Sequence, residues 1–331
     1  MLLWVLTTEE TLDIAAFQGR DIISIKDFKR EELKFLFDLT SRIKSEASSD
    51  YPTYRTSLSR KTVGLLFREP STRTVGSFTQ ATINLGGMTN GIPNPDTSSF
   101  KKGESLVDAA KIIAGQGMCA LVMRDMMEGG ARLVAEHLDI PVINGGTGSE
   151  EHPTQAILDL YTIVEKRGSL DDLTVGIIGD LKNGRTVPSL SYALSLFDNA
   201  KIHYIAPEIF QVREEVITEV KNRGVDVSKE YDPRDVITHL DVLYVTRIQE
   251  ERIKDARDLE DYRKIKDTFV VNANLVKEGK RELGIMHPLP RVDELSYDVD
   301  GLPNAWYFDQ ANNGVFARMA ILYAIAGNKS K

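Results

Sequence analysis

The sequence contains a single cysteine among its 331 residues, and this scarcity excludes two kinds of structure. Cys119 can form no intrachain disulfide, and a zinc site built from several cysteines is ruled out. Long apolar runs are also missing, because none approaches the roughly 20 residues that span a bilayer. The apolar start at residues 1–6 lacks the basic flank and the long core of a signal peptide, so we expect a cytoplasmic protein with no membrane partner.

Positive charge is in deficit as well. The sequence has 41 Lys and Arg against 49 Asp and Glu, which gives a formal net charge of −8. Non-specific nucleic-acid binding depends on a broad basic surface, so this balance argues against a nucleic-acid partner. Any anion that the protein binds must therefore be held in a local site. At roughly 100–200 residues per domain, the length predicts two domains.

Short apolar runs alternate with helical patterns along most of the chain, which is typical of βα units around parallel sheets. The expected strands are 62–67, 119–123, 141–143, 175–178, 202–206, 242–245, 269–271 and 285–286. The expected helices include one that starts at residue 153 and bridges two lobes, one over 207–224, and a buried closing helix over 314–326. Residues 88–99 are loosely composed of Gly, Asn, Pro and Ser. The predicted fold is α/β, with two doubly wound parallel sheets and the active site in the cleft between them.

Cationic or imidazole side chains follow most of these strands. Ligands of open α/β sheets bind beyond the carboxyl ends of the strands, so these side chains are candidates for ligand contact. The residues concerned are Arg68, Arg73, Arg124, Arg185, Arg247, His287 and Arg291. Their positions predict a cationic site inside a chain whose net charge is negative.

The segment Ser71-Thr72-Arg73-Thr74 opens a predicted helix directly after the first strand. Free N–H groups at a helix start, hydroxyls and a guanidinium together suit a phosphate or a carboxylate. A plain Ser N-cap is the simpler alternative. However, the helix dipole disfavours an arginine in the first turn, and this local conflict favours the anion site.

Two further segments have features of ligand-binding motifs. Gly179–Thr186 is one residue away from a nucleotide-binding P-loop, but Arg185 replaces the lysine, and Asp241 precedes its strand where a magnesium-binding aspartate would follow it. A nucleotide site is therefore disfavoured. Next to a Gly-rich loop, a helix start can present the His152 imidazole and the Gln155 amide to a ligand. The five histidines include no pair at a metal-ligand spacing, so no metal is expected.

Taken together, the motifs resemble those of the aspartate transcarbamoylase family of catalytic chains, from about Ile22 to the C-terminus. Phe67–Thr74 resembles the family's carbamoyl phosphate loop, and His152-Pro153-Thr154-Gln155 its second carbamoyl phosphate element. The other matching segments are Ser98–Glu104, which resembles the loop inserted into a neighbouring subunit, Asp180–Thr186, Thr246–Gln249 and His287–Arg291.

The resemblance implies roles for individual residues. Carbamoyl phosphate would be bound by Ser71, Thr72, Arg73, Thr74, Arg124, His152, Gln155, Pro288, Leu289 and Pro290, with Ser98 and Lys102 from the adjacent chain. L-aspartate would be bound by Lys102, Arg185, Arg247 and Gln249. The catalytic set would be Arg73, Thr74, His152 and Lys102, with no cofactor.

At the level of the whole chain, the resemblance implies transfer of a carbamoyl group to L-aspartate in pyrimidine biosynthesis, by a homotrimer with shared active sites. It assigns residues 1–152 to a carbamoyl phosphate-binding domain, to which a C-terminal helix at about 310–331 returns. Residues 153–309 then form an aspartate-binding domain. The resemblance leaves open whether a regulatory chain binds.

Two alternatives remain beside this interpretation. Ornithine transcarbamoylases share the phosphate loop and the His-Pro-x-Gln element, but they carry Ser-Met-Gly and His-Cys-Leu-Pro segments. This chain has Arg247-Ile248-Gln249 and His287-Pro288-Leu289-Pro290 in their place, which favours aspartate. A non-catalytic homologue that only binds partners would be suggested by loss of Arg73, Lys102 or His152, and the sequence keeps all three.

Overall fold

Buried aliphatic runs form the first of two parallel sheets. The computed structural model describes residues 14–92, 103–248 and 255–327. In the first sheet the strands have the order β2-β1-β3-β4, and all neighbours are parallel. Their bounds are Thr62–Phe67 for β1, Met88–Ile92 for β2, Met118–Asp125 for β3 and Val142–Thr147 for β4. Because helices cover both faces of such a sheet, its central strands are apolar almost throughout.

The second sheet has five parallel strands in the order β7-β6-β5-β8-β9. Their bounds are Thr174–Ile178 for β5, Lys201–Ile205 for β6, Asp226–Glu230 for β7, Val242–Val245 for β8 and Gly284–Met286 for β9. We call the part around the first sheet the first lobe and the part around the second sheet the second lobe. The prediction of two parallel α/β sheets is confirmed.

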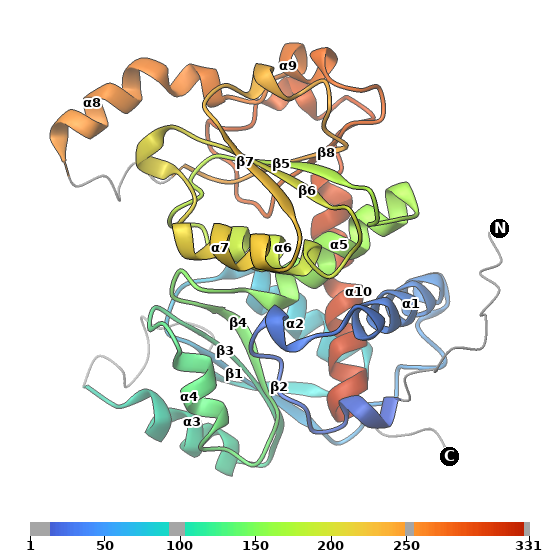
Figure 1. The fold of residues 1–331 in the computed structure, drawn as a ribbon. Coiled ribbons are helices and arrows are strands. Elements are labelled where there is room, and N and C mark those ends of the chain that lie inside the picture. Colours follow the sequence, from blue (N-terminus) through green and yellow to red (C-terminus); the bar gives the residue numbers. More distant parts are fainter. Residues whose placement is uncertain (1–13, 93–102, 249–254, 328–331) are drawn as a thin grey trace.

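The helices surround and connect the two lobes (Figure 1). They are α1 Arg30–Ser45, α2 Thr72–Asn84, α3 Leu106–Gly115, α4 Gly130–Ala135, α5 Pro153–Arg167, α6 Thr186–Leu194, α7 Glu214–Asn222, α8 Ala256–Ile265, α9 Ala273–Glu278 and α10 Tyr307–Ala326. Helix α5 packs against α1 and α10 and also against α6 of the second lobe. Helix α10 contacts α1, α2 and α5 and reaches β9 of the second sheet.

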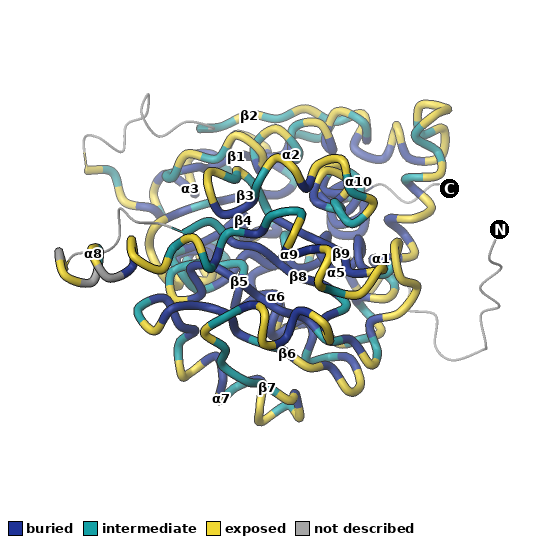
Figure 2. Tube along the Cα trace, turned by 90° about the horizontal axis from the view of Figure 1, so that it is seen from above, coloured by how far each residue is buried: buried dark blue, intermediate teal, exposed yellow. Residues whose placement is uncertain are grey.

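Burial is concentrated in the two sheets, while the edge strands β2 and β7 lie at opposite margins of the molecule (Figure 2). Neither β2 nor β7 contains a fully buried residue, since both are half-buried or exposed along their length. Both strands were missing from the sequence prediction. Their sequences, MTNGI and DVSKE, lack the apolar runs by which the inner strands are recognised. The segment 88–99 accordingly begins as a strand, which its composition did not indicate.

Two predicted elements in the second lobe are wrong. Residues 269–271 do not form a strand: a 3₁₀ turn occupies Lys266–Phe269, and Val271 makes only an isolated bridge to Leu295. The helix predicted over 207–224 is divided into a 3₁₀ turn at Glu208–Phe210 and α7. The division falls at Gln211, whose Nε2 donates to the backbone oxygens of the β6 end at 2.9–3.2 Å.

The closing helix is longer than expected, since it begins at Tyr307 and not at Gly314. Polar residues in its first turns are buried against neighbouring elements. These turns therefore lack the apolar pattern by which a buried helix is recognised in a sequence. In the parts of the chain that the structure describes, no helix combines the length and apolarity needed to cross a membrane.

Candidate active site

The predicted anion site lies in the segment between β1 and α2. Ser71 is the N-cap of α2, and its side chain makes no capping hydrogen bond to the helix. The Thr74 side chain is buried, whereas Arg73 is accessible to solvent. Partial desolvation still lowers the pKa of Arg73 from its ordinary value, although a guanidinium stays charged at neutral pH. The Ser71 hydroxyl and the Arg73 side chain are therefore available to a ligand at this helix start.

Arg124 and Arg185 converge on one carboxylate, that of Glu69. Arg124 comes from the end of β3 in the first lobe, and its Nη2 lies 2.8 Å from Glu69 Oε1. Arg185 comes from the second lobe, and its Nη2 lies 2.9 and 2.7 Å from the two oxygens of Glu69. The predicted phosphate ligand Arg124 and the predicted aspartate ligand Arg185 thus meet at one point between the lobes.

Gly146 allows the two arginines to approach this closely. Its φ of +112° lies in the region that glycine favours, and an added Cβ would lie 2.9 Å from Arg185 Nη1 and 3.3 Å from Arg124 Nη1. Arg185 Nη1 also donates to the Gly146 carbonyl at 3.0 Å. The Gly-rich end of β4 is consequently part of the site.

The charges of Arg124 and Arg185 act on the carboxylate of Glu69. Burial alone would raise the pKa of Glu69, but Arg124 and Arg185 outweigh burial and hold the pKa below its ordinary value. A depressed carboxyl pKa stabilises the folded state above the unfolded-state pKa. That contribution is lost as the pH falls through the lowered pKa of Glu69.

We expect Glu69→Gln to lower the free energy of unfolding by about 2 kcal/mol, because two largely buried guanidinium groups would lose their shared counter-ion. Saturating phosphate should restore part of this loss, since a bound anion can replace the carboxylate. Denaturant unfolding with and without phosphate measures both effects. The control Glu215→Gln removes a largely exposed carboxylate and should cost less than about 1 kcal/mol. Equal losses in the two variants would contradict the interpretation.

His152 is placed to act as an uncharged hydrogen-bonding group. It is the N-cap of α5 and 4% exposed, and its backbone N–H donates to Ser189 Oγ at 2.8 Å. Burial, followed by the charges of Arg124, Arg318 and Arg185, places the pKa of His152 well below its usual range. The imidazole is therefore neutral at neutral pH. A neutral imidazole can donate to a developing oxyanion without giving up a net proton.

The loop after β9 approaches this group from the second lobe. His287 Nδ1 accepts the Leu289 N–H at 2.7 Å, which leaves Nε2 as the donor to Glu294 Oε1 at 2.8 Å. The Leu289–Pro290 peptide bond is cis, and Leu289 has a φ of +56°. Burial lowers the pKa of His287, Glu294 opposes this effect, and the charges of Arg291 and Arg73 lower the pKa further.

The remaining predicted residues fall into two groups. Arg247 is the second residue after β8. Its neighbour Thr246 packs so closely on Gly179 that a Cβ at Gly179 would lie 2.2 Å from the Thr246 carbonyl oxygen. Arg247 thus belongs to the same end of the second sheet as Arg185. Ser98, Lys102 and Gln249 lie outside the described residues.

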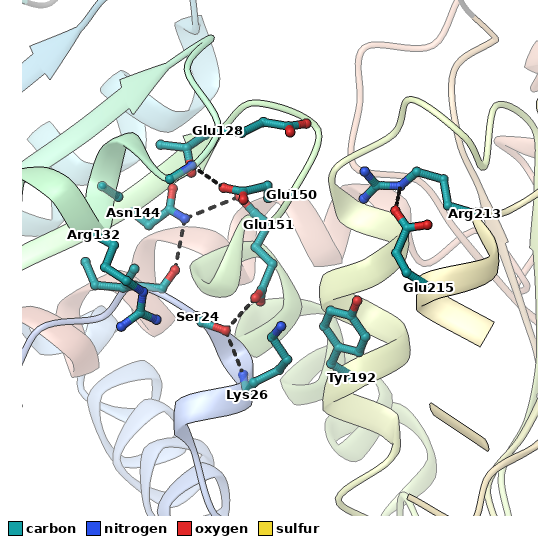
Figure 3. A pocket seen from close by; sticks show the side chains of 14 residues that line it. Ser24, Lys26, Glu128, Arg132, Asn144, Glu150, Glu151, Tyr192, Arg213 and Glu215 are labelled. Carbon is teal, nitrogen blue, oxygen red and sulfur yellow. Dashed lines mark hydrogen bonds and ion pairs between the residues drawn. The ribbon is translucent and has the colours of Figure 1, made fainter. Parts of the chain in front are cut away.

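A separate cavity of about 430 Å³ lies where residues 23–26, the β3–α4 connection, α4, the end of β4, α6 and the start of α7 meet (Figure 3). None of the predicted site residues that the structure describes lines it. Its charged groups are mostly engaged internally: Glu151 accepts from Ser24 Oγ and the Ile25 N–H, Glu150 accepts from the Gly129 N–H, and Arg213 pairs with Glu215. We therefore place the candidate reaction site at the converging arginines and His152 and not in this cavity, whose charged groups pair with one another.

The comparison with known families matches almost the whole chain. Residues 20–165 match the family described as aspartate/ornithine carbamoyltransferase, carbamoyl-P binding domain. Residues 171–325 match its Asp/Orn binding domain. The chain belongs to the aspartate/ornithine carbamoyltransferase family.

Relatives within this family are close in sequence and structure. The chain is 45% identical over 310 residues to an aspartate carbamoyltransferase catalytic subunit of Thermococcus kodakarensis, covering 92% of this chain and 96% of that protein. A catalytic subunit of Nitrosopumilus maritimus is 46% identical over 306 residues, with the same coverage. The aspartate transcarbamoylase of Trypanosoma cruzi in complex with N-(phosphonacetyl)-L-aspartic acid superposes with a TM-score of 0.87 at 34% identity, covering 94% of this chain and 97% of that one.

Sequence reasoning about the carbamoyltransferase motifs missed Glu69. The residue was visible inside the phosphate loop as an acid among cations, but only the fold shows that Arg124 and Arg185 both reach it. Among the described residues, no group of three or more His, Cys, Asp or Glu side chains is arranged to hold a metal ion.

Proposed function

We propose that the chain transfers the carbamoyl group of carbamoyl phosphate to the α-amine of L-aspartate, giving N-carbamoyl-L-aspartate and phosphate. The observation that supports this most is the meeting of Arg124, Arg185 and neutral His152 beside the α2 start. This arrangement offers cations to two anionic substrates and an uncharged donor between them. The product fits a role in pyrimidine biosynthesis.

In this proposal the phosphate binds Ser71, Thr72, Arg73 and Thr74 at the α2 start, together with Arg124. Arg124 Nε supports the assignment, because it is buried and has no hydrogen-bond partner among the described residues. An unpaired buried donor is costly unless a ligand or water satisfies it. A phosphate oxygen would satisfy it.

The carbamoyl group would lie between Arg73, Thr74 and His152 on its oxygen side, and Gln155 with the backbone of Pro288, Leu289 and Pro290 on its amide side. Arg185 and Arg247 would hold the two carboxylates of aspartate, joined by Gln249. Ser98 and Lys102 would come from a neighbouring chain. We also propose that residues 1–152, with the C-terminal helix from about 310, serve carbamoyl phosphate, and that residues 153–309 serve aspartate.

The reaction needs no nucleophilic side chain. Carbamoyl phosphate is already an activated mixed anhydride, so the amine of aspartate can attack its carbonyl carbon directly. The C–N bond forms, the carbonyl oxygen becomes an oxyanion, and the C–O bond to phosphate then breaks as the amine loses a proton. Orientation of the two substrates and donors aimed at the oxyanion provide the catalysis. Arg73, Thr74 and His152 supply those donors, and the cations neutralise the leaving phosphate.

A direct assay tests the proposal. Purified protein is given carbamoyl phosphate with either L-aspartate or L-ornithine, and each carbamoylated product is measured. We expect N-carbamoyl-L-aspartate alone. Formation of citrulline would instead identify an ornithine transcarbamoylase, and no product with either amine would favour a non-catalytic homologue.

We further propose a homotrimer with shared sites, and a mixing experiment tests it. Lys102→Ala and Arg73→Ala chains should each be inactive alone. After denaturation and joint refolding, hybrid trimers contain some sites with neither substitution, so part of the wild-type activity should return. Each variant refolded alone is the control. If the mixture stays as inactive as its components, the active sites are not shared between chains and the proposal is wrong.

A further inference from the structure

The buried carboxylate of Asp159 lies behind the proposed carbamoyl site, where it contacts the predicted ligand-binding residue Gln155. It is on the inward face of α5, and its side chain is 0% exposed. Oδ1 accepts from Gln155 Nε2 at 2.8 Å and from Gln310 Nε2 at 2.7 Å. Oδ2 accepts from the Tyr244 hydroxyl at 2.8 Å. One carboxylate therefore ties together α5, α10 and β8.

These contacts fix the orientation of two side-chain amides. An ionised carboxylate can only accept hydrogen bonds, so both glutamines must turn their NH₂ groups toward Asp159 and their oxygens away from it. Gln310 confirms this orientation independently, because its Oε1 accepts the backbone N–H of His287 at 2.8 Å. Gln155 must likewise direct Oε1 away from Asp159, as an acceptor.

Asp159 supports both groups that would contact the NH₂ of a carbamoyl ligand. Gln155 is held directly, and the Pro288–Leu289 backbone is held through Gln310 and His287. The NH₂ group of a carbamoyl ligand needs acceptors, and an oxygen of Gln155 together with backbone carbonyls would supply them. A carboxylate replaced by a hydrogen-bond donor would allow either amide to turn round.

We propose that Asp159 is a positioning residue that makes the site select a carbamoyl group, by holding the Gln155 oxygen and the Pro288–Leu289 loop toward the ligand's NH₂. This inference rests on the proposed function and deepens it. The discriminating ligand is acetyl phosphate, which keeps the phosphate and the carbonyl but has a methyl group where carbamoyl phosphate has NH₂. Replacing Asp159 should therefore change the affinity for carbamoyl phosphate and leave the affinity for acetyl phosphate unchanged.

The groups that face Asp159 also predict a pH dependence. Burial raises the pKa of Asp159 to about 6, while the hydrogen bonds from Gln310, Tyr244 and Gln155 and the charge of Arg318 oppose this effect. Arg318 is itself buried on α10, 5.1 Å from the centre of the Phe78 ring. Above pH 6 the carboxylate accepts from all three donors. Protonation below pH 6 converts one acceptor position into a donor and should loosen the amides.

The experiment measures the dissociation constants of carbamoyl phosphate and acetyl phosphate by competition, using the full chain between pH 5 and 8. For Asp159→Ala we expect carbamoyl phosphate to bind about fivefold to tenfold more weakly and acetyl phosphate to bind as in the wild type. Equal weakening of both ligands, or no weakening of carbamoyl phosphate, would overturn the proposal. The control Thr162→Val removes a different buried polar group, a hydroxyl that joins α5 to α10, and should change neither dissociation constant.

Two conservative variants keep the test informative if Asp159→Ala does not fold. Asp159→Asn presents a donor and an acceptor at every pH, as the protonated carboxyl does, and cannot titrate. It should therefore bind carbamoyl phosphate weakly throughout the range and lose the wild type's decline below pH 6. Tyr244→Phe removes a donor to the carboxylate and should move that decline to higher pH. An unchanged decline in both variants would overturn the proposal. A wild type that binds carbamoyl phosphate but does not use it would instead refute the proposed function.

Discussion

Replacing Arg73 with alanine should lower the turnover number by about 10²–10³-fold, which corresponds to roughly 3–4 kcal/mol of transition-state stabilisation. The reason is its place at the α2 start, open to solvent, where its charge acts on both Arg124 and His287. Charge develops on the carbamoyl oxygen as the amine attacks, and a fixed guanidinium stabilises this charge more than it stabilises the ground state. Steady-state kinetics with both substrates saturating measures the effect.

The matched control for Arg73 is Arg132→Ala. Arg132 is largely exposed and pairs with Asp27 at 3.3 Å on the surface. Its loss should leave the turnover number within about twofold of the wild type, as expected for a surface ion pair. A near-normal turnover number for Arg73→Ala would remove Arg73 from the catalytic set and with it the proposed location of the oxyanion.

Replacing Arg247 with alanine should raise the KM for L-aspartate by about tenfold to a hundredfold, because a charge-assisted hydrogen bond to a carboxylate contributes about 1.5–3 kcal/mol. Binding of carbamoyl phosphate should change little, since Arg247 follows β8 in the second lobe, whereas the proposed phosphate site is at the α2 start. Initial rates with each substrate varied in turn separate the two effects. The control Arg234→Ala removes an exposed arginine of the same lobe. If carbamoyl phosphate binding is lost instead, the assignment of the two lobes must be exchanged.

The inner strands were predictable because parallel strands covered on both faces must be apolar throughout. Thr62–Phe67 and Val242–Val245 have the predicted bounds. Two of the four edge strands, β4 and β9, are fully buried and were predicted in part. The side chains of β2 and β7 meet solvent, so these two strands carry no such pattern. The 207–224 helix failed because the side chain of Gln211 binds the end of β6 and competes with continued helix.

The candidate site was predictable only as far as local motifs extend. Arg124, His152 and Arg185 each follow a strand or begin a helix, and the family motifs name them. Glu69 and Asp159 act through contacts with other elements: one joins residues of two lobes, and the other joins three secondary-structure elements. An aspartate on the buried side of α5 was visible as an exception to an apolar face, but its partners were not.

Helix α10 imposes an order on biosynthesis. Its last turns complete the first lobe: Tyr323 lies edge-on to Tyr54 with ring centres 5.2 Å apart, and Lys61 donates to the Ala326 carbonyl at 2.5 Å. The ribosome makes the strands of the first lobe before the second lobe and α10. A nascent chain therefore cannot close the core of its first lobe until the whole second lobe and α10 have been translated. Unlike domains that fold as they emerge from the ribosome, the first lobe stays incomplete during this time, and the apolar faces of α1 and α2 remain accessible to chaperones.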